Sequence, residues 1–473
     1  MTPAQPDASS APATTAPRGA AGAAPSLPEG FLARADLLLA GTDADLARFL
    51  PGDSGTRQPV HTCYVPADLV TERTPAEWGA AAAAAAEEAG GLAALAGVDD
   101  AAAPDLVERV ARKLREEPVE DLRLDLEDGY GERPDAEEDA DAVRAAHTVA
   151  AFARNRASGA APAPAFAGIR FKCFEAATRA RGLRTLDLFL STLVREGGLT
   201  EAGISEDGLP EGLVLTLPKV SAVEQVAVMV EACEALEDAL GLPAGRLRFE
   251  IQMETPAMIL GPDGTCPIPA MLRTAEGRVS ALHYGTYDYS ASLGISGQFQ
   301  SLEHPAADHA KNVMQVAVAG TGVRLSDGST NRLPVGDAAQ RRETWALHSR
   351  LVRRSLERGI YQGWDLHAHQ LPTRFLTNYA FYRGAFDDAA RRLVAYAGRS
   401  VPGIETADVA DEPATARALA RYVVRGVLCG AVSEDELREK GLDPETVRAV
   451  ANPGAAAASS AGERTSPETG ETP

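Results

Sequence analysis

Hydrophobic residues along this chain gather into short runs that alternate with longer helical patterns. Eight runs rich in β-branched or apolar residues have the length of strands. Four of the longer segments, 178–196, 221–240, 308–320 and 340–359, carry apolar residues at i, i+3 and i+4 spacing, which predicts amphipathic helices. The predicted strands cover 60–67, 121–128, 166–173, 213–220, 247–254, 278–288, 322–329 and 361–368.

The order of these elements predicts the fold class. A strand followed by a helix and another strand implies parallel pairing through right-handed crossovers. Eight such units predict an α/β protein with a closed (β/α)8 TIM barrel. An open doubly wound sheet is the alternative architecture, because a count of eight strands from one sequence is easily off by one.

Composition shifts along the chain predict its domain organisation. The Ala/Pro/Ser/Thr-rich segments 1–28 and 451–473 are expected to be disordered tails. The barrel domain is expected at 29–375, with a helical insertion after the first strand at about 70–118. Residues 376–450 have a helical pattern and predict a C-terminal extension that caps the barrel or mediates assembly, so we expect a homo-oligomer.

Charge and cysteine content exclude several classes of function. The chain has 473 residues, 45% of them hydrophobic, and a net charge of −21, which argues against a nucleic-acid partner. Its five cysteines are scattered and form no CxxC pair, so neither a zinc site nor a disulfide framework is indicated. No signal peptide, membrane span or nucleotide-binding glycine motif is recognisable. We therefore expect a cytoplasmic protein without a membrane partner.

Charged or titratable residues stand at or near the carboxyl ends of seven consecutive predicted strands. In a TIM barrel these ends form the active-site mouth, so such residues are expected to converge there. Taken singly, each is more often an ordinary surface or salt-bridged residue than a catalytic one. The residues are Glu127, Asp128, Arg170, Lys172, Lys219, Glu254, Asp288, Asp327 and His367.

Two of these carboxylates predict a metal site. Glu254 ends the fifth strand and Asp288 the sixth, so the two are expected side by side, about 5 Å apart. Oxygen ligands without cysteine suit Mg²⁺, with Mn²⁺ as an alternative. Arg170 offers a two-pronged donor for a carboxylate or enolate oxygen. A divalent cation beside an arginine stabilises a developing enolate, which points to chemistry on a carbon–carbon bond next to a carbonyl.

Six segments in this order resemble a known enzyme family. They are "DLRLDLEDGY", "GIRFK", "LTLPKV", "QMETPAMI", "YGTYDYSASLGI" and "LHAHQ", spread over about residues 58–375. The chain resembles the HpcH/HpaI aldolase/citrate lyase family, which includes the citrate lyase beta subunit and the malyl-CoA lyases and belongs to the pyruvate/phosphoenolpyruvate barrel superfamily. "KVS", "HAHQ" and "IRFK" stand where that family has "KVE", "HPxQ" and "VRVN".

The resemblance implies roles for particular residues. Glu254 and Asp288 match the metal ligands, and Arg170 matches the arginine that holds the substrate carboxylate or enolate. Glu127 and Asp128 match an acidic pair of the second strand. His367 and Gln370 match a late histidine and glutamine, and His367 is counted with Arg170, Glu127 and Asp128 among the catalytic candidates. The expected substrate-binding residues are Arg170, Lys172, Lys219, Gly285 and Thr286.

These observations favour an enzyme, a Mg²⁺-dependent carbon–carbon lyase or aldolase acting on a 3-hydroxy acid or its CoA thioester. Two other functions stay open: phosphoryl or carboxyl chemistry on phosphoenolpyruvate or pyruvate, and a non-catalytic barrel that serves as a binding module. The general base is open among Glu127, Asp128, Asp327, His61 and His367. A Schiff-base route through Lys172 or Lys219 is the alternative to metal-dependent chemistry.

Overall fold

The computed structural model describes residues 26–28, 30–96, 103–398 and 412–452. It divides into two compact units, residues 1–48 and 49–473. The first unit is described mainly by helix α1 (Phe31–Phe49), which has no buried residue. The expected disordered tails, 1–28 and 451–473, lie almost entirely outside the described residues, so they stay a prediction.

The second unit contains the predicted barrel. Its eight strands are all parallel and follow the order β7-β6-β5-β4-β3-β2-β1-β8. Each predicted strand is confirmed, although each is shorter than predicted because residues at its ends already belong to a loop or, for Asp288, to the helix that follows. The strands are β1 (His61–Pro66), β2 (Asp121–Asp125), β3 (Phe166–Arg170), β4 (Leu213–Leu217), β5 (Phe249–Met253), β6 (Val279–Tyr284), β7 (Arg324–Ser326) and β8 (Gly363–Asp365).

The barrel closes between β7 and β8. Ser326 forms an isolated parallel bridge with Gln362, the residue before β8. Two backbone hydrogen bonds extend this contact, from Asp327 N to Gln362 O at 2.8 Å and from Trp364 N to Gly328 O at 3.1 Å. The closed barrel is therefore confirmed, and the open-sheet alternative is excluded.

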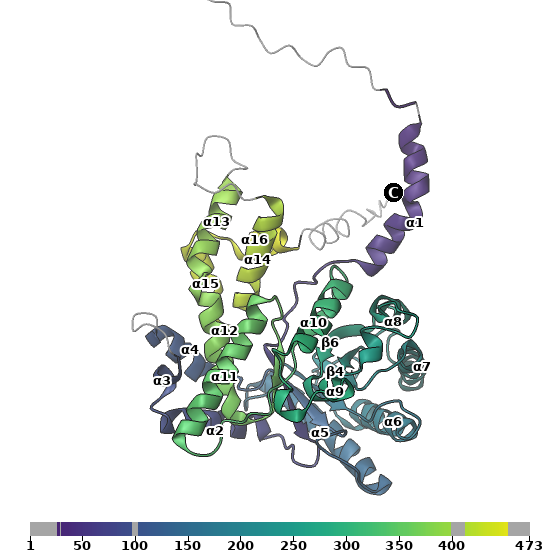
Figure 1. Cartoon of the computed structure of the whole chain (residues 1–473). Coiled ribbons are helices and arrows are strands. Elements are labelled where there is room, and N and C mark those ends of the chain that lie inside the picture. The colour runs from purple at the N-terminus through teal and green to yellow at the C-terminus, as the bar shows by residue number, and fades with distance from the viewer. Residues whose placement is uncertain (1–25, 29, 97–102, 399–411, 453–473) are drawn as a thin grey trace, which may run out of the picture. The chain divides into compact units, whose positions relative to one another are not determined.

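Helices cover the outside of the strands (Figure 1). The outward side chains of β2, Leu122 and Leu124, are fully buried against them, as are Phe189 and Leu190 on the helix after β3. The apolar spacing in the sequence thus creates the interface between barrel and helices. The helices that follow β2 to β7 are α5 (Asp135–Ser158), α6 (Arg179–Glu196), α7 (Val223–Leu240), α8 (Ile268–Thr274), α9 (Thr286–Ser292), α10 (Pro305–Val318) and α11 (Ala338–Glu357).

Two further groups of helices flank the barrel. The segment between β1 and β2 forms α2 (Thr74–Glu88), α3 (Leu92–Ala96) and α4 (Ala103–Glu116), where an insertion was expected. After β8, α12 (Leu371–Gly384) packs on α4 and α11, and a separate apolar cluster joins the helices that follow. These are α13 (Phe386–Gly398), α14 (Pro413–Leu428), α15 (Glu434–Glu439) and α16 (Pro444–Ala451). In the described part of the chain, no helix has the length and apolarity to span a membrane.

Candidate active site

The inside of the barrel is polar and charged. Arg123 on β2 is fully buried and donates from Nε and Nη2 to the two carboxylate oxygens of Glu250, each at 3.0 Å. Its Nη2 also donates to Asp121 at 3.0 Å, and its Nε to the hydroxyl of Thr216 at 2.9 Å. Burial raises the pKa of Asp121 and opposes ionisation of Glu250, but Arg123 and His283 hold the pKa of Glu250 below its usual range. Such a pair is stable only because each charge keeps its partners.

Two aromatic residues stand next to this buried network inside the barrel. Tyr64 on β1 and Trp364 on β8 have ring centroids 4.8 Å apart. The indole of Trp364 donates to His283 Nδ1 at 3.0 Å, and the guanidinium of Arg170 lies 4.8 Å from the Tyr64 ring centroid. Tyr64 therefore lies beside Arg170 at the mouth, and Trp364 contacts both Tyr64 and His283.

Arg170, the last residue of β3, is held rigidly at this mouth. Its Nε and Nη2 donate to Asp125 Oδ1 and Oδ2 at 2.6 and 2.7 Å, a bidentate pair. The remaining nitrogen, Nη1, points to Gln252 Oε1 and Glu127 Oε2, both at 3.4 Å. Asp125 thus fixes the orientation of Arg170 and leaves Nη1 for interactions within the mouth.

The loop after β2 wraps around the same carboxylate. Asp125 Oδ1 accepts from Glu127 N at 3.1 Å, and Asp125 Oδ2 accepts from Gly129 N at 2.8 Å. A Cβ on Gly129 would lie 2.7 Å from Asp125 Oδ2, so the glycine is required for this close approach. The loop therefore carries Glu127 and Asp128 over the mouth in a defined position.

Lys219 lies between the acidic residues of the mouth. It has a left-handed backbone conformation, with φ of +50°, which is uncommon for a lysine. Its Nζ donates to Glu127 and Asp128 and lies 4.0 Å from Asp288 Oδ2. Burial works against the charged form, but Glu127 and Asp128 raise the pKa of Lys219 above its ordinary value. The side chain is therefore a fixed positive charge at neutral pH.

Glu254 follows β5 directly and is 2% exposed. Its Oε2 accepts from Lys219 N at 3.2 Å, and its side chain passes so close to Gly285 that a Cβ there would stand 2.2 Å from Glu254 Cγ. Burial raises the pKa of Glu254 to about 8, Asp288 and Glu127 add to the rise, and Arg170 and Lys219 oppose it. The charge of this carboxylate is thus poorly compensated by the residues around it.

Asp288 approaches the same region from a helix, which corrects the expectation that it ends a strand. Strand β6 stops at Tyr284, and Asp288 lies in the first turn of α9. Its side chain is 47% exposed, whereas Glu254 is buried. Burial raises the pKa of Asp288, Lys219 opposes this, and Asp128 adds to it. The pair therefore combines one buried and one solvent-facing carboxylate, with β5 and β6 adjacent in the barrel as expected.

These residues fit a hard divalent cation. The mouth brings five carboxyl groups, those of Asp125, Glu127, Asp128, Glu254 and Asp288, together with two cations, Arg170 and Lys219. A bound cation would neutralise the excess negative charge and would lower the raised pKa of Glu254. Within the described ranges, no three His, Cys, Asp or Glu side chains form a complete metal-binding group. Glu254 and Asp288 would therefore be the protein's ligands to Mg²⁺, which typically takes one or two carboxylates, and water and substrate would be its other ligands.

Some predicted site residues lie outside this group. Lys172 donates to Leu126 O at 3.0 Å and to Glu138 Oε2 at 2.7 Å, so its charge is used beside helix α5. Thr286 is buried, and its hydroxyl donates to Ser329 O at 3.1 Å. His367 packs edge-on against His369, with 4.5 Å between the ring centroids, and burial and His369 lower its pKa. Gly285 acts through the space that it leaves for Glu254.

Two candidates for the general base have structural contacts instead. Asp327 is buried and accepts from Lys311 Nζ at 2.9 and 3.0 Å. His61 points out of the barrel, where its Nδ1 lies 2.8 Å from Asp365 Oδ2 and its Nε2 accepts from Glu120 N at 3.0 Å. Of the five candidates, Glu127 and Asp128 are those that contact Lys219 in the mouth.

Sequence reasoning missed Asp125, Gln252 and Tyr64, which shape the mouth from inside the barrel. A usable signal was present for Asp125: in "DLRLDLED" the polar residues 121, 123 and 125 alternate with leucines, so they share one face of the strand. The same alternation places Gln252 on the face of Glu250 and Glu254. Gln252 Nε2 is buried and has no hydrogen-bond partner among the described residues.

The fold and the mouth define a TIM-barrel protein with an acidic, arginine-containing site at the carboxyl ends of its strands. Residues 39–454 match the family model DUF6986, described as a domain of unknown function. The chain belongs to this family. No curated protein matches the sequence.

Several solved structures resemble the chain at low identity. One is a citrate lyase from Burkholderia xenovorans LB400, with 17% identity, a TM-score of 0.49, and coverage of 85% of this chain and 98% of that one. Another is the CitE protein of Mycobacterium tuberculosis in complex with magnesium, acetoacetate and coenzyme A, with 18% identity, a TM-score of 0.43, and coverage of 80% and 99%. A third is malate synthase of Haloferax volcanii in a magnesium/glyoxylate complex, with 13% identity, a TM-score of 0.44, and coverage of 85% and 99%. Citrate lyase proteins, which the sequence motifs resemble, are thus also among the solved structures that are similar to this chain.

Proposed function

We propose that this protein is a Mg²⁺-dependent carbon–carbon lyase or aldolase that acts on a 3-hydroxy acid or its CoA thioester. The observation that carries the proposal is the combination of two features in the mouth. Arg170 Nη1 lies 3.4 Å from Gln252 Oε1 and from Glu127 Oε2, and the pKa values of Glu254 and Asp288 are raised by burial although the charge of Arg170 acts against the rise. When bound there, a divalent cation supplies electrophilic stabilisation of the negative charge that develops on a carbonyl oxygen during cleavage.

The chain's own residues supply orientation. Because Asp125 occupies Nε and Nη2 of Arg170, only the Nη1 side faces Gln252 and Glu127. A substrate carboxylate would thus meet Nη1 alone, and not the two-pronged face of Arg170 expected from the sequence, because Asp125 occupies that face. Holding the substrate there lowers the entropic cost of reaching a reactive geometry. The buried amide nitrogen of Gln252 is a second donor at this place.

Glu127 is the candidate for proton transfer. Burial raises its pKa, and Asp128 adds to the rise, while Arg170 and Lys219 act against it. A carboxyl group with a raised pKa can exchange a proton nearer to neutral pH than an exposed glutamate. Lys219, which contacts Glu127, would hold it toward the mouth.

A Schiff-base route is disfavoured by the surroundings of the lysines. A Schiff base needs a neutral amine, but Glu127 and Asp128 raise the pKa of Lys219. Lys172 is occupied by Glu138 and two carbonyl groups. Borohydride reduction in the presence of pyruvate should therefore leave no lysine adduct, and a reduced adduct on either lysine would contradict the proposal.

The direct test combines metal binding with turnover. Glu254→Gln and Asp288→Asn should each abolish Mg²⁺ binding in calorimetry and the release of the aldehyde, ketone or keto acid fragment from a panel of 3-hydroxy acids and their CoA thioesters. Asp238→Asn, an exposed carboxylate on α7, is the matched control and should change neither. Turnover that survives chelation by EDTA would contradict the proposal.

A further inference from the structure

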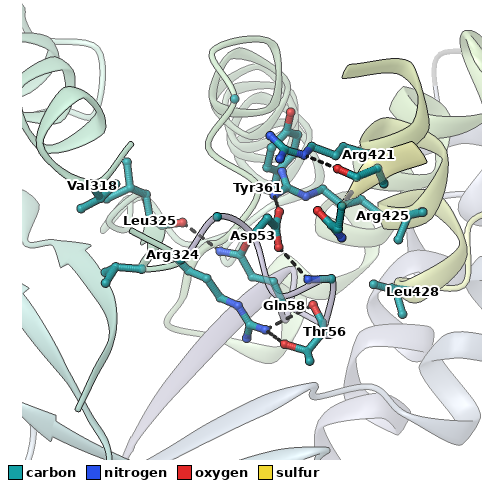
Figure 2. A pocket seen from close by; sticks show the side chains of 18 of the residues that line it. Asp53, Thr56, Gln58, Val318, Arg324, Leu325, Tyr361, Arg421, Arg425 and Leu428 are labelled. Atoms are coloured by element: carbon teal, nitrogen blue, oxygen red, sulfur yellow. Dashed lines mark hydrogen bonds and ion pairs between the residues drawn. The ribbon is translucent and has the colours of Figure 1, made fainter. Parts of the chain in front are cut away.

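A cavity of about 350 Å³ lies at the opposite end of the barrel from the mouth. Arg324 and Leu325, at the start of β7, form part of its wall, whereas the mouth is built at the carboxyl ends of the strands. Segment 52–58, the end of α10 and one face of α14 complete the wall (Figure 2). The volume falls within the range of small-molecule sites, roughly 300–1,000 Å³.

The charged residues of this cavity are mainly arginines, although the whole chain has a net charge of −21. Arg324, Arg421 and Arg425 line it, and Asp53 is the one acidic residue among its lining residues. Figure 2 shows these side chains reaching it from β7, from α14 and from the segment before β1. The local excess of positive charge would attract an anion into this part of an acidic protein.

Two of the arginines also have structural contacts. Arg425 Nη2 donates to Asp53 Oδ2 at 2.8 Å, and its guanidinium lies 4.1 Å from the ring centroid of Tyr361. Arg421 Nε donates to Ala451 O at 3.0 Å. The contacts of Arg425 hold α14 against the barrel, whereas that of Arg421 holds α14 against the end of α16, and they account for the positions of both arginines without any ligand.

Arg324 is different because its charge is not neutralised. It donates to the carbonyl and the hydroxyl of Thr56, and no carboxylate of the described residues forms a salt bridge with it. Burial lowers the pKa of Arg324, and the neighbouring Arg248 and Arg425 lower it further, whereas the charges of Asp53 and Asp121 oppose this. A half-buried guanidinium repelled by two others is a costly arrangement that a bound anion would relieve.

The rest of the wall is apolar or backbone. Val318, Leu325, Val424 and Leu428 contribute aliphatic surface, and Tyr361 contributes an aromatic ring. Gln58 is held in place by donating from Nε2 to Leu325 O at 3.0 Å. A ligand that fits would thus combine an anionic group with a small apolar body.

We propose that this cavity is a binding site for a small organic anion, a carboxylate or a phosphate attached to an apolar body, with Arg324 as its principal recognition residue. The site is separate from the mouth and does not depend on the function proposed for it. In a TIM barrel, catalysis takes place at the carboxyl ends of the strands, so a ligand bound here would act as an effector and not as the substrate.

Calorimetric titration of the full chain tests this proposal, with phenyl phosphate and benzoate as the two probes. EDTA is present throughout, so that binding at a metal in the mouth does not contribute. At least one probe should bind once per chain, and Arg324→Gln should weaken it by about tenfold, equal to about 1.4 kcal/mol. Arg324→Lys should lose less, because it keeps the charge, and Arg391→Gln, at an exposed arginine of α13, should lose nothing.

A second measurement protects the test against a variant that does not fold. Hydrogen exchange of the wild-type chain, with and without the probe that binds, should show added protection in 318–325 and 421–428 and none in the loop 125–129. Three results would each overturn the proposal. The first is phenyl phosphate binding that is as strong in Arg324→Gln as in Glu254→Gln. The others are added protection confined to the mouth, and the failure of both probes to bind.

Discussion

Gly285 and Glu254 are in such close contact that no side chain fits at position 285. A Cβ there would lie 2.2 Å from Glu254 Cγ and 2.5 Å from its Oε1. Because β5 and β6 are paired up to Met253 and Tyr284, the residues that follow are held side by side by the barrel backbone. The glycine therefore sets where the buried carboxylate of the mouth lies.

This contact predicts the effect of Gly285→Ala. The new methyl group should displace Glu254, because the backbone on either side is held by the strand pairing. We expect Mg²⁺ binding to be lost and kcat/KM to fall by about a hundredfold, as for a misplacement of about 1 Å in an active site. Calorimetry and steady-state kinetics measure the two effects.

Gly297→Ala is the matched control, since a Cβ at Gly297 would contact nothing within 4 Å. It should leave both quantities unchanged. A Gly285→Ala protein that binds Mg²⁺ as tightly as the wild type would show that the position of Glu254 is not what matters.

The raised pKa of Glu254 predicts that stabilisation by Mg²⁺ grows with pH. The carboxyl has a pKa of about 8 in the folded chain against an ordinary value of 4.5, so the folded state holds this proton more tightly than the unfolded state. Without metal, this group's contribution to stability is complete below 4.5 and is lost as the pH rises through about 8. Mg²⁺ binds the deprotonated form and should reverse the loss.

Thermal melts with and without Mg²⁺ check this expectation. The rise in Tm caused by Mg²⁺ should be larger at about pH 9 than at about pH 6. Glu254→Gln should show no rise at either pH, because it carries no ionisable group at this position. An equal rise in the wild type at both pH values would contradict the assignment of Glu254 as a metal ligand with a raised pKa.

Lys219→Met should separate metal binding from turnover. The ammonium lies 4.0 Å from Asp288 Oδ2, so it repels a cation bound there. Its removal should tighten Mg²⁺ binding by roughly fivefold, the equivalent of about 1 kcal/mol for a partly exposed charge. Turnover should fall, because Glu127 and Asp128 lose the contact that holds them over the mouth.

Lys440→Met serves as the comparison, since Lys440 is partly exposed on the C-terminal helices and pairs with Asp387. It should affect neither metal affinity nor turnover. Weaker Mg²⁺ binding in Lys219→Met would show instead that the lysine supports the metal site.

Arg123→Met should strongly destabilise the barrel. The substitution leaves Asp121 and Glu250 buried without the guanidinium that both of them contact. Removing one partner of a buried ionic network costs about 3–5 kcal/mol in the free energy of unfolding. Urea unfolding measures the loss.

The exposed pair of Arg391 and Asp388 gives the contrast for this experiment. Arg391→Met should change the free energy of unfolding by less than about 1 kcal/mol, as for other surface salt bridges. Equal effects of Arg123→Met and Arg391→Met would mean that the network inside the barrel contributes little to stability.

The sequence by itself determined the number, order and type of the strands. Patterns with a period of 2 or 3.6 residues depend on residues close together in the chain. The structure therefore has the eight predicted strands, and the predicted helices 178–196, 221–240, 308–320 and 340–359, within a few residues of their expected bounds. It also determined that Arg170 and Glu254 lie at the same end of the barrel, because parallel strands of a closed barrel end on the same side.

Only the tertiary structure decided how the side chains of the mouth are paired. The direction of a side chain beyond a strand depends on loop dihedrals and on contacts with residues far along the chain. For this reason Asp288 arrives on a helix, Lys172 turns to Glu138, and Asp125 is the partner of Arg170. The cavity around Arg324 has the same origin, because it is formed by segments more than 300 residues apart in the chain, which no local pattern brings together.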